Sequence, residues 1–191
     1  MTGRVLALLL AGGDSTRMGR DKATLEWHGQ PLWTRQIETL RSLQPDTLAA
    51  ASWNRPEWLP GDIIWLKDTH PDRGPLSGIA AALESTASDH ILVLAIDMPC
   101  MISKYLHSLR ADCGPAKGIV PITPNGWEPL AAIYPAEARA LTRKHLEAGK
   151  YGLQNWVSEL AQERLIQPRN VLAEESELFK NVNHPTDLEG S

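Results

Sequence analysis

Apolar and polar positions follow two patterns along this chain: continuous apolar runs typical of buried strands, and the spacing typical of amphipathic helices. Continuous apolar runs at 5–10 and 91–96 predict strands at the centre of a sheet. Apolar residues at Trp33, Ile37 and Leu40 recur at helical spacing, so they predict a helix that opens near a proline. Strand and helix patterns alternate in this way through the first half of the chain. This alternation predicts an α/β fold with a mostly parallel central sheet.

The remaining expected elements are shorter or less regular. In chain order, they are strands at 47–52 and 63–66, helices at 76–85 and 103–111, strands at 118–122 and 129–134, helices at 136–148 and 153–161, and short strands at 164–167 and 178–182. The chain contains no repeat and no interdomain linker. We therefore expect one domain over residues 1–191.

A glycine-rich loop follows the first predicted strand. Gly12 and Gly13 let the backbone turn tightly and bring its N–H groups against a phosphate. Arg17 and Lys22 add positive charge to the same loop. The carboxyl end of a strand is where open α/β sheets bind ligands. The loop therefore predicts a phosphate site, and the alternative is a turn with two solvated cations.

The spacing in this loop excludes two common phosphate motifs. Lys22 is followed by Ala23 rather than Ser or Thr, which excludes the nucleoside triphosphatase loop. The adjacent pair Gly12-Gly13 excludes the Gly-x-Gly-x-x-Gly pattern of dinucleotide-binding proteins. A dinucleotide-dependent reductase is therefore disfavoured.

A carboxylate ends the second long apolar run. Asp97 follows 91–96 and should lie at the same sheet edge as the glycine-rich loop. A carboxylate that faces bound phosphates needs a cation between them. Mg²⁺ suits this place, because it binds one or two carboxylates together with water and phosphate oxygens. The alternative is an Asp that only caps the turn before Pro99.

The stretch from Leu10 to Lys22 resembles the signature of nucleotidyltransferases with a glycosyltransferase-A-like fold, Leu-Ala-Gly-Gly-x-Ser-x-Arg-Met-Gly-x-Asp-Lys. The resemblance implies a three-layer, Rossmann-like architecture and extends to Asp68 and the Gly-Pro-Leu-x-Gly turn at 74–78. A polar contact to base or ribose is expected after the strand at 47–52, from Ser52 or, preferably, Asn54. The implied nucleotide-binding residues are Leu10, Ala11, Gly12, Gly13, Lys22, Asn54, Asp68 and Asp97. The implied catalytic residues are Arg17, Lys22 and Asp97, with Asp97 as the metal ligand.

The C-terminal stretch Asn-Val-Asn-His-Pro-Thr-Asp-Leu at 181–188 resembles a motif of the molybdenum cofactor guanylyltransferases of the MobA type. This resemblance implies that GMP is transferred from GTP to molybdopterin, or to its molybdenum-loaded form, with release of pyrophosphate and formation of the guanine dinucleotide cofactor. Asn181 and Asn183 would bind the acceptor, with residues 1–111 forming a nucleotide half and 112–191 an acceptor half. Gly12 favours GTP over CTP, because cytidylyl relatives usually carry alanine there. The alternatives are a related transferase that uses CTP or another phosphate acceptor, and a catalytically silent nucleotide-binding protein.

Composition limits the possible partners and location. The formal charge of −4 gives no broad basic surface, so nucleic acid is not expected as a partner. The longest apolar run, 5–11, is too short to span a membrane, and no signal peptide is expected. Cys100 and Cys113 lack metal-type spacing, which suits a reduced cytoplasmic protein. Transient contacts with proteins of molybdenum cofactor biosynthesis, or with the enzymes that receive the cofactor, remain an expectation from the resemblance.

Overall fold

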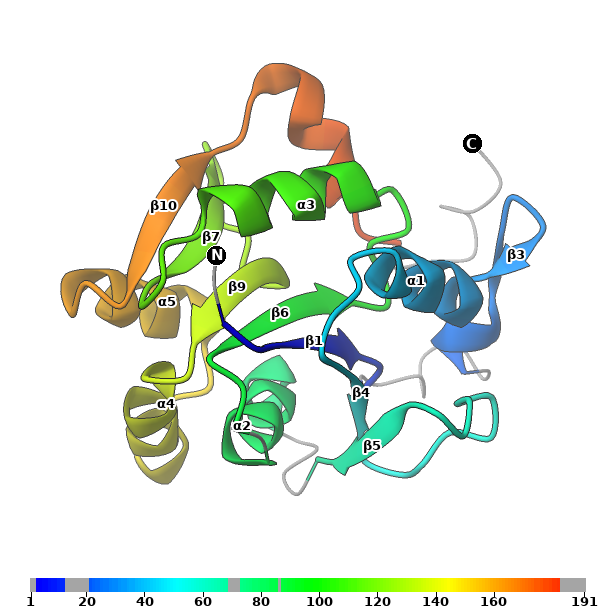
Figure 1. Cartoon of the computed structure of the whole chain (residues 1–191), viewed down its shortest axis with the longest axis horizontal. Helices are drawn as coiled ribbons and strands as arrows, with labels where there is room; N and C mark the ends of the chain where they lie inside the picture. The colour runs from blue at the N-terminus through cyan, green and yellow to red at the C-terminus, as the bar shows by residue number, and fades with distance from the viewer. Residues whose placement is uncertain (1–2, 13–20, 69–72, 86, 183–191) are drawn as a thin grey trace.

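The computed structural model describes residues 3–12, 21–68, 73–85 and 87–182. Its centre is an eight-stranded sheet in the order β10-β7-β9-β6-β1-β4-β5, with β8 paired to β7 (Figure 1). The strands of this sheet are β1 Val5–Leu10, β4 Thr47–Ser52, β5 Ile64–Lys67, β6 His90–Ala95, β7 Gly118–Thr123, β8 Gly126–Trp127, β9 Ala131–Pro135 and β10 Ile166–Asn170. Most neighbouring pairs are parallel, and β9 runs antiparallel to both β6 and β7. The expected mixed, mostly parallel α/β sheet is confirmed.

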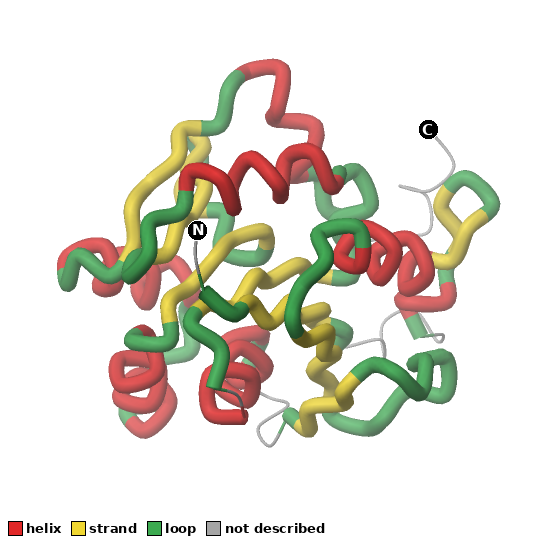
Figure 2. The backbone as a smooth tube through the Cα atoms, viewed as in Figure 1, coloured by secondary structure: helices red, strands yellow, loops and turns green. Residues whose placement is uncertain are grey.

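Helices cover both faces of the sheet (Figures 1 and 2). The α-helices are α1 Leu32–Arg41, α2 Pro75–Ser85, α3 Ser103–Asp112, α4 Ala138–Glu147 and α5 Leu153–Gln162. Two 3-10 helices, η2 Lys22–Thr24 and η4 Ala173–Phe179, and a small hairpin of β2 Glu26–Trp27 and β3 Gln30–Pro31 complete the described elements. The layered arrangement predicted from the alternating pattern is therefore present.

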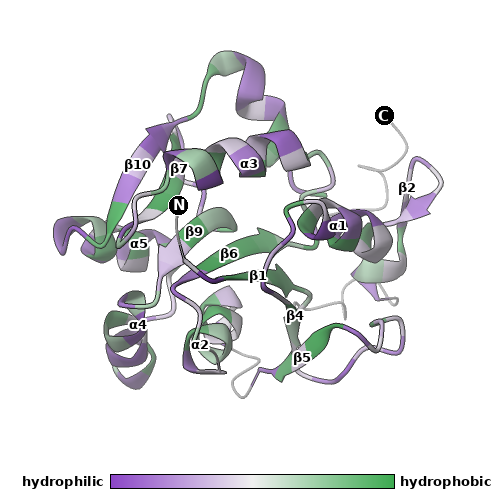
Figure 3. Cartoon of the chain, viewed as in Figure 1, coloured by the Kyte–Doolittle hydropathy of each residue, from purple (hydrophilic) through white to green (hydrophobic). Residues whose placement is uncertain are grey.

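The core divides into two clusters because successive strand residues point to opposite faces. Val5, Ala7 and Leu9 of β1 pack in the cluster that contains the buried residues of α1 and α3. Their neighbours Leu6, Leu8 and Leu10 pack in the cluster that contains those of α2, α4 and α5. Both faces of the central strands are therefore buried, which explains their continuous apolar runs (Figure 3).

Two predictions for the C-terminal third are wrong in detail. Residues 178–182 do not form a strand, because Phe179 packs edge-on against Tyr105 of α3, with ring centroids 5.3 Å apart. The first two residues of this segment end the 3-10 helix η4, and residues 180–182 have no regular secondary structure. The strand expected at 164–167 lies at Ile166–Asn170 instead, because Arg164 adopts a left-handed φ of 60° after α5 and delays sheet pairing.

The β2–β3 hairpin was not predicted. His28 and Gly29 both have positive φ values, 50° and 77°, which form a tight turn between two very short strands. Strands of two residues are too short to show an alternating pattern. Within the described part of the chain, no helix has the length and apolar character needed to cross a membrane.

Candidate functional site

Four neighbouring strands end at one edge of the sheet, and backbone hydrogen bonds continue between them past the strand ends. Ile96 N–H donates to the Leu10 carbonyl at 3.0 Å, and Ala11 N–H donates to the Ala51 carbonyl at 3.0 Å. Asp68 N–H then donates to the Ser52 carbonyl at 2.9 Å. These bonds join the ends of β6, β1, β4 and β5 in sheet order. The segments that begin at Asp97, Gly12, Asn54 and Asp68 therefore leave the sheet from the same edge.

Lys22 and Asp97 form an ion pair at this edge. The Lys22 Nζ lies 3.2 Å from the Asp97 Oδ2, and the two side chains are 18% and 24% exposed. The two residues are 75 positions apart in the chain. The structure thus brings together the cation and the carboxylate that the sequence assigned to one site.

Asp21 fixes the turn that presents Lys22. Its Oδ1 accepts a hydrogen bond from Ala23 N–H at 3.0 Å and so caps η2. Its Oδ2 accepts from the Trp58 indole Nε1 at 2.7 Å, and that ring stacks on Trp33 with centroids 5.7 Å apart. The ammonium of Lys22 is therefore carried on a short segment held from two sides.

The segment that carries Asp97 is held by α1 and by the C-terminal part of the described chain. Gln36 of α1 donates from Nε2 to the carbonyls of Ala95 and Met98, at 3.1 and 2.7 Å. The Asp97 carbonyl accepts a hydrogen bond from Val182 N–H at 2.8 Å. The Asp97 Oδ1 is buried and has no hydrogen-bond partner among the described residues. One carboxylate oxygen thus contacts Lys22, and the other is a buried acceptor that no described residue satisfies.

The beginning of the glycine-rich loop lies beside this pair. Leu10 is buried at the end of β1, and its carbonyl accepts the hydrogen bond from Ile96 N–H. Ala11 is half-buried and Gly12 is exposed. Gly13 and Arg17 lie outside the described residues, so their assignments as nucleotide-binding and catalytic groups stay predictions.

Close packing of α2 explains why the 74–78 turn has a glycine at position 78. A Cβ at this position of α2 would lie 2.8 Å from Leu10 Cδ2 and 3.2 Å from Ala51 Cβ. Its absence lets α2 pack closely on β1 and β4. The motif thus has a packing role beside any contact with a ligand.

Asp68 is tied to the first turn of α2. Its side chain is buried, and its Oδ2 accepts a hydrogen bond from Ser77 Oγ at 2.7 Å. Ser52 is also buried, and its hydroxyl donates to the Asn54 carbonyl at 2.8 Å while accepting from Trp65 Nε1 at 3.1 Å. The side chain of Asn54 is exposed. Within the pair left open by the sequence, Asn54 is therefore the residue with a side chain directed to solvent.

The acceptor motif is only partly described. Asn181 is exposed and precedes Val182, whose N–H binds the backbone of Asp97. The start of the motif therefore lies next to the Lys22–Asp97 pair. Asn183 and the rest of the motif to residue 188 lie outside the described residues.

Two polar residues near this edge were not picked out from the sequence. Gln36 is fully buried, and Glu128 is a half-buried carboxylate whose pKa is raised by burial. Glu128 precedes Leu130, whose carbonyl accepts from Ala95 N–H at 2.9 Å at the end of β6. A lone glutamine on a helix and a lone glutamate in a hairpin carry no recognisable spacing. Only the fold places Gln36 beside Asp97 and Glu128 near the end of β6.

The chain also contains a pocket on the side of the sheet that α2 and α4 cover. It has a volume of about 450 Å³ and lies between β5, α2 and α4, where Lys67, Ser77 and Arg143 help to line it. Among the described residues, none of those predicted to bind nucleotide, metal or acceptor lines this pocket. This pocket is therefore separate from the residues that the sequence assigns to the candidate site.

Comparison with known proteins identifies the family of the chain. The sequence pattern of the MobA-like NTP transferase domain matches residues 7–165. A probable molybdenum cofactor guanylyltransferase from Opitutus terrae is 35% identical over 94% of this chain and 90% of its own length. A molybdenum cofactor guanylyltransferase from Pseudomonas fluorescens is 32% identical over 85% of this chain and 84% of its own length.

Solved structures show the same architecture. The crystal structure of molybdopterin-guanine dinucleotide biosynthesis protein A from Archaeoglobus fulgidus superimposes with a TM-score of 0.72. It covers 96% of this chain and 95% of its own, at 22% sequence identity. At that identity the likeness supports the fold alone, whereas the matched family pattern and the sequence relatives cover most of the chain. The chain belongs to the MobA-like NTP transferase domain family.

Proposed function

We propose that this chain transfers GMP from GTP to the terminal phosphate of molybdopterin and releases pyrophosphate. The observation that carries the proposal is the Lys22–Asp97 pair at the carboxyl edge of the sheet. It occurs in a chain whose sequence relatives are named molybdenum cofactor guanylyltransferases. In this proposal, residues 1–111 bind the nucleotide and residues 112–191 bind the acceptor.

The reaction needs no nucleophile from the protein. An oxygen of the acceptor phosphate attacks the α-phosphorus of GTP, and a new P–O bond forms. The bond from that phosphorus to the oxygen bridging the α- and β-phosphates breaks, and its electron pair leaves with pyrophosphate. The task of the chain is to align two anionic substrates and to balance the charge that they bring together.

Lys22 supplies the first part of that balance. Its ammonium is already held at the edge by the capped turn of Asp21. A cation placed where negative charge develops stabilises the transition state more than it stabilises the separate substrates. Arg17 is proposed to act with Lys22, and the backbone of Gly12 and Gly13 to bind phosphate oxygens.

Asp97 suits a divalent cation, for which we propose Mg²⁺. Its buried Oδ1 lacks a partner among the described residues, and a carboxylate oxygen is the ligand type that Mg²⁺ prefers. Among the described residues, no group of three His, Cys, Asp or Glu side chains could hold a metal ion. Asp97 would therefore share the ion with substrate phosphates and water. When bound, the ion would neutralise charge on those phosphate oxygens.

The nucleoside is proposed to lie over the ends of β1, β4 and β5. The exposed Gly12 leaves space for a purine, and the exposed Asn54 has an amide that can both donate and accept hydrogen bonds. Asp68 is proposed to contact the nucleoside through the carboxylate that Ser77 orients.

The acceptor is proposed to bind where the C-terminal segment meets Asp97. Asn181 begins that segment, and the bond from Val182 to the Asp97 carbonyl brings it to the reacting edge. Asn183 is proposed to act with Asn181. Contacts with other proteins that make or receive the cofactor belong to the same proposal.

Pyrophosphate release tests the function. Purified protein is incubated with Mg²⁺ and molybdopterin, with GTP and CTP in parallel reactions. We expect release with GTP, loss of release in Asp97→Asn, and normal release in Asp62→Asn. Asp62 is a matched control, because it is an exposed carboxylate paired with Arg41 at the surface. Release with CTP alone would indicate a cytidylyltransferase, and GTP binding without release would indicate a silent binding protein.

A further inference from the structure

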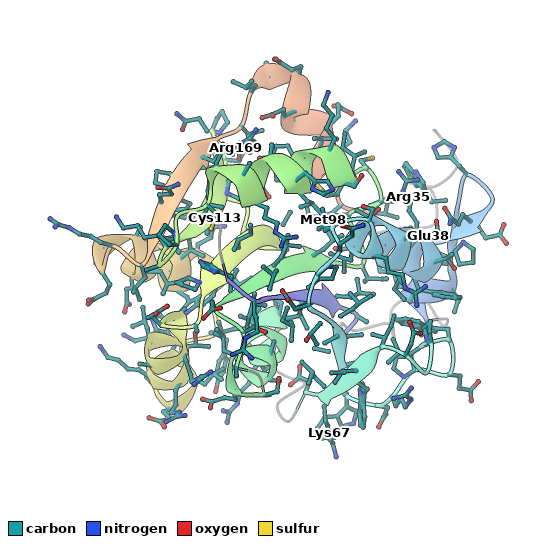
Figure 4. All side chains as sticks on the ribbon, in the orientation of Figure 1. Arg35, Glu38, Lys67, Met98, Cys113 and Arg169 are labelled. Carbon is teal, nitrogen blue, oxygen red and sulfur yellow. The ribbon has the colours of Figure 1, made fainter. Side chains whose placement is uncertain are left out.

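A single buried amide holds the backbone on both sides of Asp97. Gln36 has no exposed surface, and its Nε2 donates to the Ala95 carbonyl at 3.1 Å and to the Met98 carbonyl at 2.7 Å. Both N–H groups of the amide are thus used on one turn. Arg35, its neighbour on α1, donates from Nε to the Pro99 carbonyl at 2.5 Å. Figure 4 shows Arg35 and Met98 where α1 meets the segment after β6.

The turn needs these donors because its carbonyls face the core. After β6 ends, the carbonyls of Ala95 and Met98 lie in a cluster of apolar side chains. A buried carbonyl without a donor costs free energy of the order of a lost hydrogen bond. Among the neutral side chains, only an asparagine or glutamine amide offers two N–H donors on one nitrogen.

The amide is an unfavourable choice for packing alone. The Gln36 Oε1 is buried and has no hydrogen-bond partner among the described residues. The rest of the buried face of α1 is apolar, with Leu32, Ile37 and Leu40 in the core. A methionine would fill a similar volume without burying an unpaired oxygen. Glutamine at this position therefore packs less favourably than an apolar residue would, but its two hydrogen bonds hold the 95–98 turn.

We infer that Gln36 is a positioning residue for Asp97. It fixes the carbonyl before Asp97 and the carbonyl after it, so the carboxylate leaves the backbone in one orientation. The Oδ1 of Asp97, which is buried and lacks a hydrogen-bond partner among the described residues, is then held in one place beside the edge where the nucleotide is proposed to bind. This inference rests on the proposed role of Asp97 in holding a divalent cation with GTP.

Metal binding without turnover tests the inference. Mn²⁺ is titrated into the protein in the presence of α,β-methylene GTP, whose α–β linkage is not cleaved, and free Mn²⁺ is measured by electron paramagnetic resonance. Gln36→Met removes both donors at similar volume, and Gln36→Glu keeps the shape while removing the N–H donors. We expect Mn²⁺ affinity to fall about 10–100-fold in each variant, the range seen when a partner that orients a metal ligand is lost.

Two further variants separate the possible outcomes. Ile37→Val changes the adjacent core position on α1 without touching the turn, and should keep wild-type Mn²⁺ affinity even where its melting temperature falls. Asp97→Asn should lose Mn²⁺ affinity. If it does not, the proposed metal site itself is wrong.

The experiment can refute the role of Gln36 while leaving the proposed metal site at Asp97 intact. If Asp97→Asn loses Mn²⁺ affinity while Gln36→Met and Gln36→Glu keep it, Asp97 is oriented by other contacts. If neither Gln36 variant folds, the amide serves the stability of the core and is not specific to Asp97. Kinetics of pyrophosphate release add a second readout. A Gln36 variant with reduced kcat and an unchanged KM for GTP would support a role in orienting the carboxylate.

Discussion

Replacement of Gly12 by alanine separates a glycine required by the ligand from a glycine required by the fold. A Cβ added at Gly12 would meet Ser52 Cα at 3.8 Å and the Ala51 carbonyl oxygen at 3.9 Å, which are ordinary contacts. Alanine at a compatible glycine position stabilises a protein by about 0.4–1 kcal/mol through the unfolded chain. For a chain of this length, that corresponds to a rise of roughly 1–4 °C in melting temperature.

The same methyl group should weaken the use of GTP as a substrate. If the guanine or its ribose packs against Gly12, the added group overpacks the contact at a cost of about 1–3 kcal/mol. That cost lowers kcat/KM for GTP by roughly 5–150-fold. Kinetics of pyrophosphate release with GTP and CTP, together with thermal melts of the same preparation, measure both effects. CTP, which carries the smaller base, should lose less.

Gly118→Ala is the matched control. A Cβ at Gly118 would overlap the carbonyl oxygen of Ile133 in β9 and lie 2.9 Å from Pro135 Cδ. Because a backbone atom in a paired strand cannot move aside easily, we expect a loss of about 3 kcal/mol or more. This variant should melt well below wild type. A Gly12→Ala protein that melts low, or that uses GTP as well as wild type does, would refute the reasoning.

Three other predictions concern charge, acceptor binding and pH. Lys22→Ala should lower turnover at least about tenfold. Its melting temperature should change little, because a partly exposed ion pair contributes only about 0–1 kcal/mol, and unchanged kinetics would remove Lys22 from the site. Asn181→Ala should raise the KM for molybdopterin about 2–10-fold and leave that for GTP unchanged, and equal effects on both would place Asn181 elsewhere. Burial raises the pKa of Cys113 from 9.0 to about 11 and the pKa of Tyr105 from 10.0 to about 12. The neutral forms are favoured in the fold, so this stability is complete below pH 9.0 and falls as the pH rises toward about 12. Urea unfolding midpoints across this range should show the decline, and Cys113→Ala should reduce the part between 9.0 and about 11.

The sequence predicted the fold well where one physical effect dominates. The runs at 5–10 and 91–96 are apolar because both faces of β1 and β6 are buried, so their short, continuous apolar character identifies them. The meeting of Lys22 and Asp97 also followed from the sequence, since parallel strands place their carboxyl ends at one edge. The prediction did not depend on how far apart the two residues are in the chain.

Other features depend on contacts that no local pattern reveals. Phe179 at the end of η4 packs against Tyr105 of α3, a contact between residues far apart in the chain. In the sequence, Gln36 is one polar residue on an amphipathic helix. Only the fold shows that its side chain donates to the carbonyls of Ala95 and Met98. The approach of Val182 to Asp97 likewise joins segments that only the complete sheet brings together.

The most direct test of the proposed reaction follows the phosphorus atoms of GTP. The protein is incubated with Mg²⁺, molybdopterin and GTP labelled at either the α- or the γ-phosphate, and the products are separated and weighed by mass spectrometry. We predict that the α-label enters a product with the mass of the guanine dinucleotide and that the γ-label appears in pyrophosphate. Both labels in the acceptor product, or an α-label that stays in GTP or free GMP, would contradict guanylyl transfer at this site.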